Sequence, residues 1–113
     1  MEKRLVKRPW GGFRQFTLNE KSTVKILEIK PKKRTSLQYH ENRSEFWRVL
    51  DNSLKITIGK KVIKAKKDDE FFVPKKTNHR LEGLNNTSHI LEISFGNFKE
   101  SDIKRLEDDF GRK

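Results

Sequence analysis

The regular spacing of turn residues is the feature that most constrains how this chain can fold. Short runs rich in β-branched and aromatic residues are separated by Gly, Pro, Asn, Asp and Ser at intervals of roughly ten residues. Eight runs are predicted to be strands, at residues 23–29, 36–40, 45–50, 54–58, 62–65, 70–73, 79–82 and 89–95. No alternation of strands with helices is evident. The pattern therefore predicts an all-β sandwich or barrel.

Two segments lie outside these runs. Residues 8–12, Arg-Pro-Trp-Gly-Gly, have the composition of a turn-rich entry. Near the other end, Ile103 and Leu106 are three residues apart and follow Ser101, a candidate N-cap. Residues 101–109 are therefore predicted to form a short helix or an ordered coil.

The composition fits one small domain, residues 1–113, with a lean core. Hydrophobic residues make up 32% of the 113 positions and charged residues 38%. A domain of this size buries roughly two-thirds of its unfolded surface. The absence of cysteine excludes disulfides and thiolate metal sites. No apolar run approaches the ~20 residues of a membrane span, and the N-terminus has no signal-peptide pattern, so we expect a cytoplasmic protein without a membrane partner.

The net charge of +11 has two interpretations. It favours an anionic partner, either nucleic acid or a phosphorylated small molecule. Alternatively, a Lys-rich surface reflects the genome or habitat rather than a binding face. A nucleic-acid-binding barrel would interleave aromatics with basic residues along an exposed strand, and only Phe71-Phe72 before Pro74-Lys75-Lys76 weakly resembles this. We therefore do not expect nucleic acid to be the partner.

Four side chains could bind one metal ion. Gln38 and His40 are two residues apart in a predicted strand, so both point to one face. Glu45 opens the next strand, and a hairpin through residues 41–44 would return it beside His40. His79 follows a turn much later in the chain. This set of oxygen and nitrogen ligands suits Zn, Mn, Co, Ni, Fe or Mg and leaves coordination positions open. Isolated strand histidines are more often surface or core residues, so the spacing alone leaves both interpretations open.

Several strings occur in the order found in one protein family. They are Arg8-Pro-Trp-Gly11, Ser36-Leu-Gln-Tyr-His40 with Arg43 and Glu45-Phe-Trp47, Pro74 with His79-Arg-Leu-Glu82, and Ile103 through Asp108-Asp-Phe-Gly-Arg112. Together they resemble the type II mannose-6-phosphate isomerase domain of the cupin superfamily. That domain also forms the C-terminal part of bifunctional enzymes with mannose-1-phosphate guanylyltransferase activity. The resemblance covers about residues 8–112.

The resemblance implies a cupin jelly-roll, a double-stranded β-helix barrel. It implies that Gln38, His40, Glu45 and His79 bind one divalent metal ion, and that Arg80 takes part in catalysis. The implied substrate is a phosphorylated hexose, and the implied assembly is a homodimer.

The chain departs from the family pattern at several positions. Phe46 stands where the family has a histidine, but strand alternation turns this position away from Glu45. Lys32 replaces the glycine of a Pro-Gly turn, and Phe98 and Phe110 replace tyrosines. No Gly-rich nucleotide loop is present, so this chain by itself would supply only the isomerase step.

Aldose–ketose isomerisation needs a base that moves a proton between C2 and C1 through an enediolate. A guanidinium is a poor base, and Arg80 should face away from the metal if its neighbour His79 faces toward it. Glu92 or Glu82 would be a chemically better base.

The remaining candidates are cationic. Lys25 and Arg43 are predicted to contact the substrate phosphate. The resemblance thus implies a metal-dependent isomerase that interconverts mannose 6-phosphate and fructose 6-phosphate. The alternative is a non-enzymatic sugar- or metal-binding cupin module.

Overall fold

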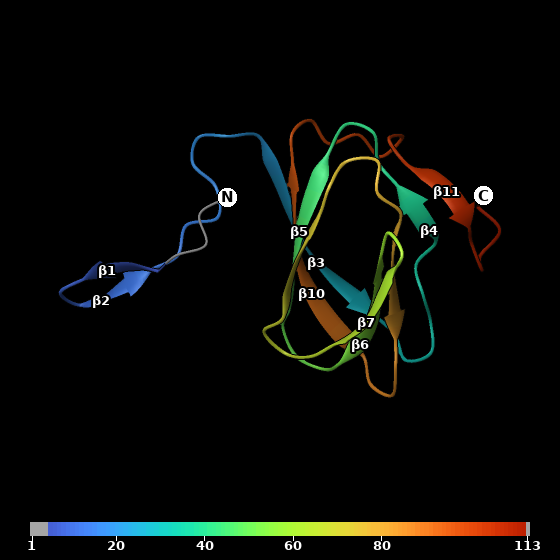
Figure 1. The fold of residues 1–113 in the computed structure, drawn as a ribbon, viewed down its shortest axis with the longest axis horizontal. Helices are drawn as coiled ribbons and strands as arrows, with labels where there is room; N and C mark the ends of the chain where they lie inside the picture. The colour runs from blue at the N-terminus through green and yellow to red at the C-terminus, as the bar shows by residue number, and fades with distance from the viewer. Residues whose placement is uncertain (1–4, 113) are drawn as a thin grey trace.

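The computed structural model describes residues 5–112, which form eleven strands and no helix (Figure 1). The strands are β1 (Val6–Arg8), β2 (Gly11–Phe13), β3 (Ser22–Ile29), β4 (Leu37–Tyr39), β5 (Ser44–Val49), β6 (Leu54–Ile58), β7 (Lys61–Ala65), β8 (Glu70–Val73), β9 (His79–Gly83), β10 (Ser88–Phe95) and β11 (Lys104–Glu107). The predicted all-β architecture is confirmed.

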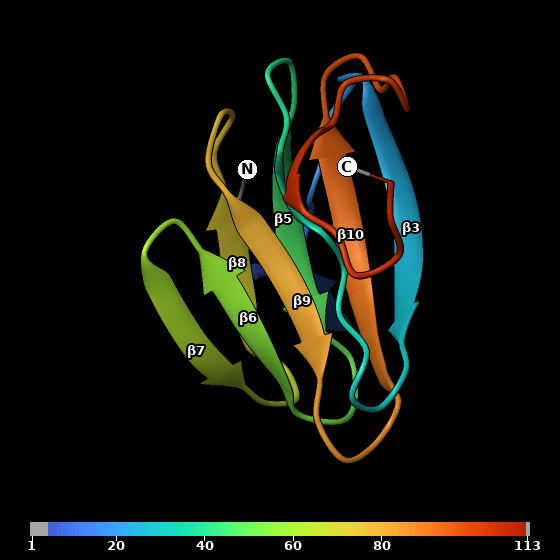
Figure 2. The ribbon, with the colours of Figure 1, turned by 90° about the vertical axis from the view of Figure 1, so that its right-hand side faces the viewer.

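Nine of these strands form the two antiparallel sheets of a jelly roll. One sheet has the order β3-β10-β5-β8 and the other β11-β4-β9-β6-β7. Figure 2 shows β7, β6 and β9 side by side, next to β5, β10 and β3. Non-consecutive neighbours such as β10 and β5 explain why residues far apart in the sequence meet between the sheets.

A compact apolar core fills the space between the two sheets. Strand β5 shows the alternation that builds it: Trp47 and Val49 are 1% and 0% exposed and belong to the core cluster. Burying side chains of this size contributes roughly 1.5–3 kcal/mol each. Phe46 packs instead against Phe16, with ring centroids 5.4 Å apart. Glu45, which has the same parity as Trp47 and Val49, is therefore held over the inner face of the sheet.

The predicted helix or coil at residues 101–109 is wrong, because β11 (Lys104–Glu107) is a strand paired antiparallel with β4. The Asp102 carboxylate fixes the start of this segment by accepting hydrogen bonds from the backbone N–H groups of residues 41 and 42, each at 3.0 Å. The pairing is irregular, and Leu106 is 38% exposed. The spacing of Ile103 and Leu106 therefore belongs to an irregular strand and not to a helix face.

The segment at residues 8–12, which was predicted to be rich in turns, contains the turn of a β-hairpin. It belongs to the hairpin of β1 and β2, which lies to one side of the barrel (Figure 1). Trp10 is 74% exposed. The chain reaches the barrel only after the hairpin, where Arg14 forms an ion pair with Glu70.

The turn before β4 holds a basic residue in an unfavourable conformation. Lys32 has φ of 63°, a left-handed value that favours glycine. The turn also lies close to β9, because a Cβ atom on Gly83 would be 2.2 Å from the Lys30 carbonyl oxygen. The turn is therefore retained although Lys32 stands where the family has a glycine.

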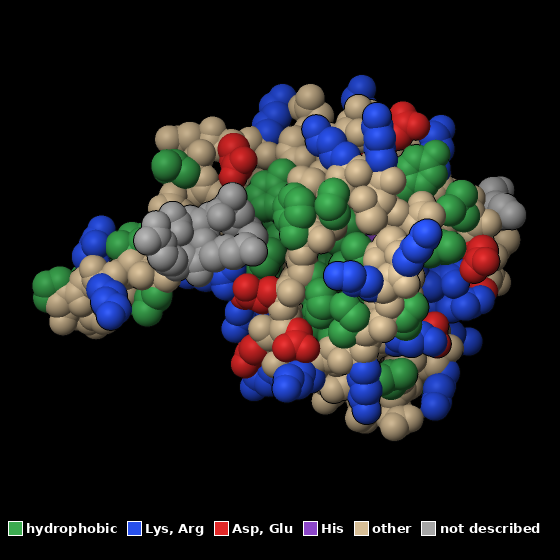
Figure 3. All heavy atoms as spheres, viewed as in Figure 1, with side chains coloured by type: hydrophobic (Ala, Val, Ile, Leu, Met, Phe, Trp, Pro, Cys, Tyr) green, Lys and Arg blue, Asp and Glu red, His purple; other side chains and the backbone are tan. Residues whose placement is uncertain are grey.

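Basic side chains are spread over the visible face of the barrel and do not form one stripe (Figure 3). This distribution gives no support to a nucleic-acid groove on that face. Among the described residues, the structure contains no helix of a length and hydropathy that would cross a membrane.

Candidate metal centre

Three predicted metal ligands meet inside the barrel. His40, Glu45 and His79 are 3%, 2% and 2% exposed. Glu45 Oε1 lies 3.7 Å from His40 Nε2 and 3.3 Å from His79 Nε2. Ligands ~2.1 Å from a shared tetrahedral ion would be ~3.4 Å apart. The spacing of these atoms therefore fits one metal ion.

Backbone carbonyls orient both imidazoles. His40 Nδ1 lies 2.6 Å from the Asp102 carbonyl oxygen, and His79 Nδ1 lies 2.9 Å from that of Thr77. A carbonyl only accepts, so each Nδ1 carries the hydrogen. Each Nε2 is then left with a lone pair directed into the site, as metal-binding histidines require.

The ligand atoms also lack ordinary partners. His79 Nε2 and Glu45 Oε1 are buried and have no hydrogen-bond partner within residues 5–112. Buried polar atoms without partners are rare in native proteins and often mark the place of an ion. Of the three candidate ligand atoms, His40 Nε2 is the only one with a hydrogen-bond partner in the described structure. It accepts a hydrogen bond from the Arg43 guanidinium at 3.2 Å. The residues present thus fit a divalent ion.

Gln38 lies beside this group. It is the register partner of His79 across β4 and β9, and its Oε1 accepts a hydrogen bond from Ser36 Oγ at 2.5 Å. Gln38 lines the same cavity of about 270 Å³ as His40 and Glu45. Its role as a fourth ligand stays a prediction.

Burial sets the protonation of the metal-free site. Desolvation, reinforced by the negative charge of Glu92, raises the pKa of Glu45 to about 8. Desolvation lowers the pKa of His79 to about 4 and lowers the pKa of His40 as well. At neutral pH the metal-free set is therefore two neutral imidazoles and one protonated carboxyl group.

The structure brings Lys25, Arg43 and Glu92 to the same cavity. Glu92 lies opposite Lys25 on β3 and opposite Trp47 on β5. Trp47 Nε1 donates to Glu92 Oε2 at 3.3 Å. The Phe98 ring contacts two cations: Lys25 Nζ and Arg43 Cζ each lie 4.2 Å from its centroid. Carboxylate and cations thus surround the space next to the ligand atoms.

Sequence comparison places this constellation in a known family. Residues 1–108 match the family described as mannose-6-phosphate isomerase C-terminal. The chain belongs to the mannose-6-phosphate isomerase C-terminal family.

Curated relatives of this family member include polysaccharide-biosynthesis proteins. It is 32% identical over 111 residues to the xanthan biosynthesis protein XanB of Xanthomonas campestris, covering 96% of this chain and 24% of that protein. It is 33% identical over 109 residues to the alginate biosynthesis protein AlgA of Pseudomonas aeruginosa, covering 95% and 23%. It is 31% identical over 111 residues to the mannose-1-phosphate guanylyltransferase ManC of Salmonella typhimurium, covering 96% and 23%. The chain thus spans about a quarter of the length of these relatives.

Solved structures show the same fold in cupins. An oxalate decarboxylase from Bacillus subtilis superposes with a TM-score of 0.70 at 19% identity, covering 77% of this chain and 24% of that chain. A cupin-2 domain from Rhodospirillum rubrum superposes with a TM-score of 0.65 at 16% identity, covering 78% and 64%. The cupin jelly roll expected from the sequence is confirmed.

In this mannose-6-phosphate isomerase C-terminal domain, Arg80 does not line the ligand cavity. Its Nε donates to the Thr35 carbonyl oxygen at 2.9 Å, and its Nη1 lies 3.1 Å from Glu107 Oε1. Strand alternation explains the placement, since His79 precedes it on β9 and points into the site. The geometry shows Arg80 tying β9 to β11, and the catalytic role implied by the resemblance stays a prediction.

Two other titratable residues lie apart from the centre. Glu82 forms an ion pair with Lys55 at 3.6 Å. The third histidine, His89, is paired through Nδ1 with Asp51 at 2.6 Å and is half-exposed. Within the described part of the chain, Glu92 is therefore the better placed of the two candidate bases.

Sequence reasoning missed two arginines that line the ligand cavity, Arg105 and Arg112. Both lie near the C-terminal end of the sequence. The helix or coil predicted for residues 101–109 gave no reason to expect their side chains at the cavity. Recognising a strand at 104–107 would have placed Arg105 beside Gln38, its register partner.

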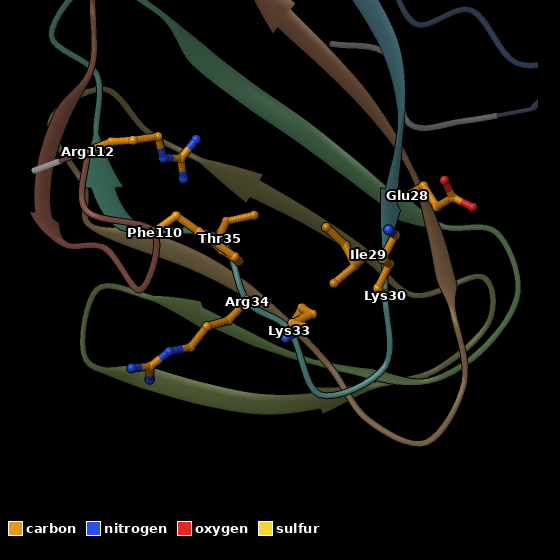
Figure 4. Close-up of a pocket in the computed structure, with 8 residues that line it drawn as sticks. All are labelled: Glu28, Ile29, Lys30, Lys33, Arg34, Thr35, Phe110 and Arg112. Carbon is orange, nitrogen blue, oxygen red and sulfur yellow. The ribbon is translucent and has the colours of Figure 1, made fainter.

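A larger cavity of about 450 Å³ adjoins the first and shares Thr35 and Arg112 with it (Figure 4). Figure 4 shows the Arg34 guanidinium directed away from Ile29 and Thr35. It is held by Asp109 through bonds of 2.6 and 2.9 Å. Three of the four predicted metal ligands, Gln38, His40 and Glu45, line the smaller cavity, which is where chemistry is expected.

Proposed function

We propose that this chain is a metal-dependent aldose–ketose isomerase that interconverts mannose 6-phosphate and fructose 6-phosphate through an enediolate. The observation that carries the proposal is the buried triad of His40, Glu45 and His79, whose ligand atoms converge and largely lack other partners. Membership of the mannose-6-phosphate isomerase C-terminal family supports a phosphorylated sugar as the substrate class.

The protein would supply metal-binding side chains that are buried from water and held in fixed orientations. A divalent ion held by His40, Glu45 and His79, with Gln38 as the proposed fourth ligand, would act as a Lewis acid on the carbonyl and hydroxyl oxygens at C1 and C2. The carbonyl groups of Asp102 and Thr77 keep both imidazoles in the tautomer that this requires.

Glu92 is the proposed base. It is 8% exposed, lines the cavity and is held at one oxygen by Trp47 Nε1. In the forward direction its carboxylate would take the proton from C2 of the aldose and return it to C1, while the hydroxyl proton passes from O2 to O1. A carboxylate shielded from bulk water keeps the abstracted proton available for return. The tie from Arg80 to Glu107 would act indirectly, by holding β9 in place.

The cavity cations complete the proposal. Lys25 and Arg43 would face the substrate's negative charge, either the phosphate or the developing oxyanion. Arg43 already donates to the Lys99 carbonyl oxygen at 3.0 Å, so its position is fixed before substrate arrives.

A coupled assay tests the activity. Mannose 6-phosphate is supplied to protein incubated with each candidate divalent ion, and fructose 6-phosphate is detected by a linked enzyme. The proposal expects turnover with at least one ion. Binding of mannose 6-phosphate without turnover under any ion would instead identify the non-enzymatic sugar- or metal-binding module.

The homodimer and the cytoplasmic location stay predictions of the same proposal. The β1–β2 hairpin supports a dimer, because an isolated two-stranded hairpin is marginal in water, and because Trp10 in its turn and Leu5 just before it are exposed. Light scattering of the wild type and of Trp10→Ser tests the dimer. A monomeric wild type would reject it.

A further inference from the structure

The guanidinium of Arg105 has no ion-pair or hydrogen-bond partner among residues 5–112. It is the one half-buried residue of β11, where its neighbours on the strand are exposed. Its Nε is buried and has no hydrogen-bond partner within residues 5–112. Three other arginines near this end of the barrel form ion pairs with carboxylates: Arg34 with Asp109, Arg80 with Glu107 and Arg112 with Asp108.

A buried guanidinium nitrogen without an acceptor is energetically costly, so its missing partner needs an explanation. The planar fork of arginine matches the oxygens of a phosphate in a bidentate arrangement. Because the side chain lines the same cavity as His40 and Glu45, an anion that enters this cavity would meet it. Arg105 thus has the chemistry and the access of an anion receptor.

The position of Arg105 also sets a direction for the ligand. It lies opposite Gln38 on β4, and Gln38 lies opposite His79 on β9. Two strand spacings separate Arg105 from His79, or about 10 Å between backbones. A six-carbon chain with a terminal phosphate spans such a separation, with its reacting carbons at the metal ligands and its phosphate at the far end.

We propose that Arg105 is the residue that binds the phosphate of the substrate, and that it thereby selects sugars phosphorylated at the end distant from the reacting carbonyl. This inference rests on the proposed function for the identity of the sugar, but the phosphate contact itself does not require turnover. Lys25, on the opposite sheet, would contribute charge across the cavity.

Calorimetric binding of mannose 6-phosphate, inorganic phosphate and unphosphorylated mannose tests the proposal on the full chain. The variants are Arg105→Met, which keeps the apolar stem, and Arg105→Lys, which keeps the charge. Lys104→Met is the matched control, because it removes a neighbouring exposed charge of the same strand. We expect Arg105→Met to weaken both phosphate-containing ligands about 10- to 100-fold, Arg105→Lys to fall between, and Lys104→Met to remain within twofold of the wild type. Affinity for mannose should not change.

The inference is overturned if Arg105→Met binds mannose 6-phosphate as tightly as the wild type, or if the wild type binds neither phosphate ligand. If Arg105→Met fails to fold by circular dichroism, Arg105→Lys decides by the same criterion. Arg105-dependent binding in a protein without isomerase activity would refute the proposed function and keep this inference. Isomerase activity with an unchanged KM in Arg105→Met would keep the proposed function and refute this inference.

Discussion

Glu45 Oε1 lies 3.3 Å from His79 Nε2, and neither atom has a hydrogen-bond partner in the described part of the chain. A neutral imidazole with its hydrogen on Nδ1 presents only a lone pair to the carboxyl group. Once Glu45 is ionised, the two atoms both present only lone pairs, so the pair is a poor contact without a cation and a good one with a divalent ion between them. This relationship separates a metal centre from an ordinary buried ion pair.

Glu45→Gln should abolish metal binding without destabilising the metal-free protein at pH 8. Glutamine keeps the shape of the side chain and removes a buried carboxyl group whose Oε1 has no hydrogen-bond partner among the described residues. Metal analysis after dialysis and urea unfolding of the stripped proteins measure the two effects. A stripped variant markedly less stable than the stripped wild type would indicate a structural role for the carboxylate instead.

Metal binding at pH 7 should release about one proton. Burial raises the pKa of Glu45 to about 8, so its carboxyl group is protonated in the metal-free protein and must ionise to become a ligand. The pKa of His79 is lowered to about 4, so this imidazole is already neutral and releases none. Affinity should thus rise about tenfold per pH unit between roughly pH 6 and 8 and then level off.

Calorimetry in buffers of different ionisation enthalpy counts the released protons. An affinity that is flat from pH 6 to 8, with no proton released, would show that Glu45 is already ionised or is not a ligand.

Glu92→Gln should reduce kcat about 10²- to 10⁴-fold, the usual contribution of a general base. The amide keeps the hydrogen bond from Trp47 Nε1, so metal content and sugar-phosphate affinity should remain near the wild-type values. Glu100→Gln is the control, since Glu100 lines the cavity but is exposed. A kcat for Glu92→Gln within threefold of the wild type would assign the base elsewhere.

Lys32→Gly should stabilise the protein by about 1 kcal/mol, because it removes the strain of a left-handed side chain while adding some entropy to the unfolded state. Lys33 is not among the described residues with positive φ, so Lys33→Gly should destabilise by about 0.5–1 kcal/mol. Urea unfolding compares the two variants. Equal destabilisation by both would contradict the strain at Lys32.

The sequence was informative where alternation and turns decide structure. Gln38 and His40 share a face because they are two residues apart, and Phe46 points away from Glu45 because it is one apart. The tail was predicted wrongly because the spacing of Ile103 and Leu106 also fits a helix, whereas the pairing with β4 is a long-range contact. That Arg105 has no partner within residues 5–112 could not be inferred from the sequence, since it depends on which carboxylates pair with the neighbouring arginines.

The most direct measurement is the rate of mannose 6-phosphate isomerisation as a divalent ion is titrated into chelator-stripped protein. The account predicts no rate without the ion, a rise that saturates near one ion per chain, and no rate at any ion level for His79→Ala. A rate in the stripped protein that added ion does not change, or no rate under any ion tested, would contradict it.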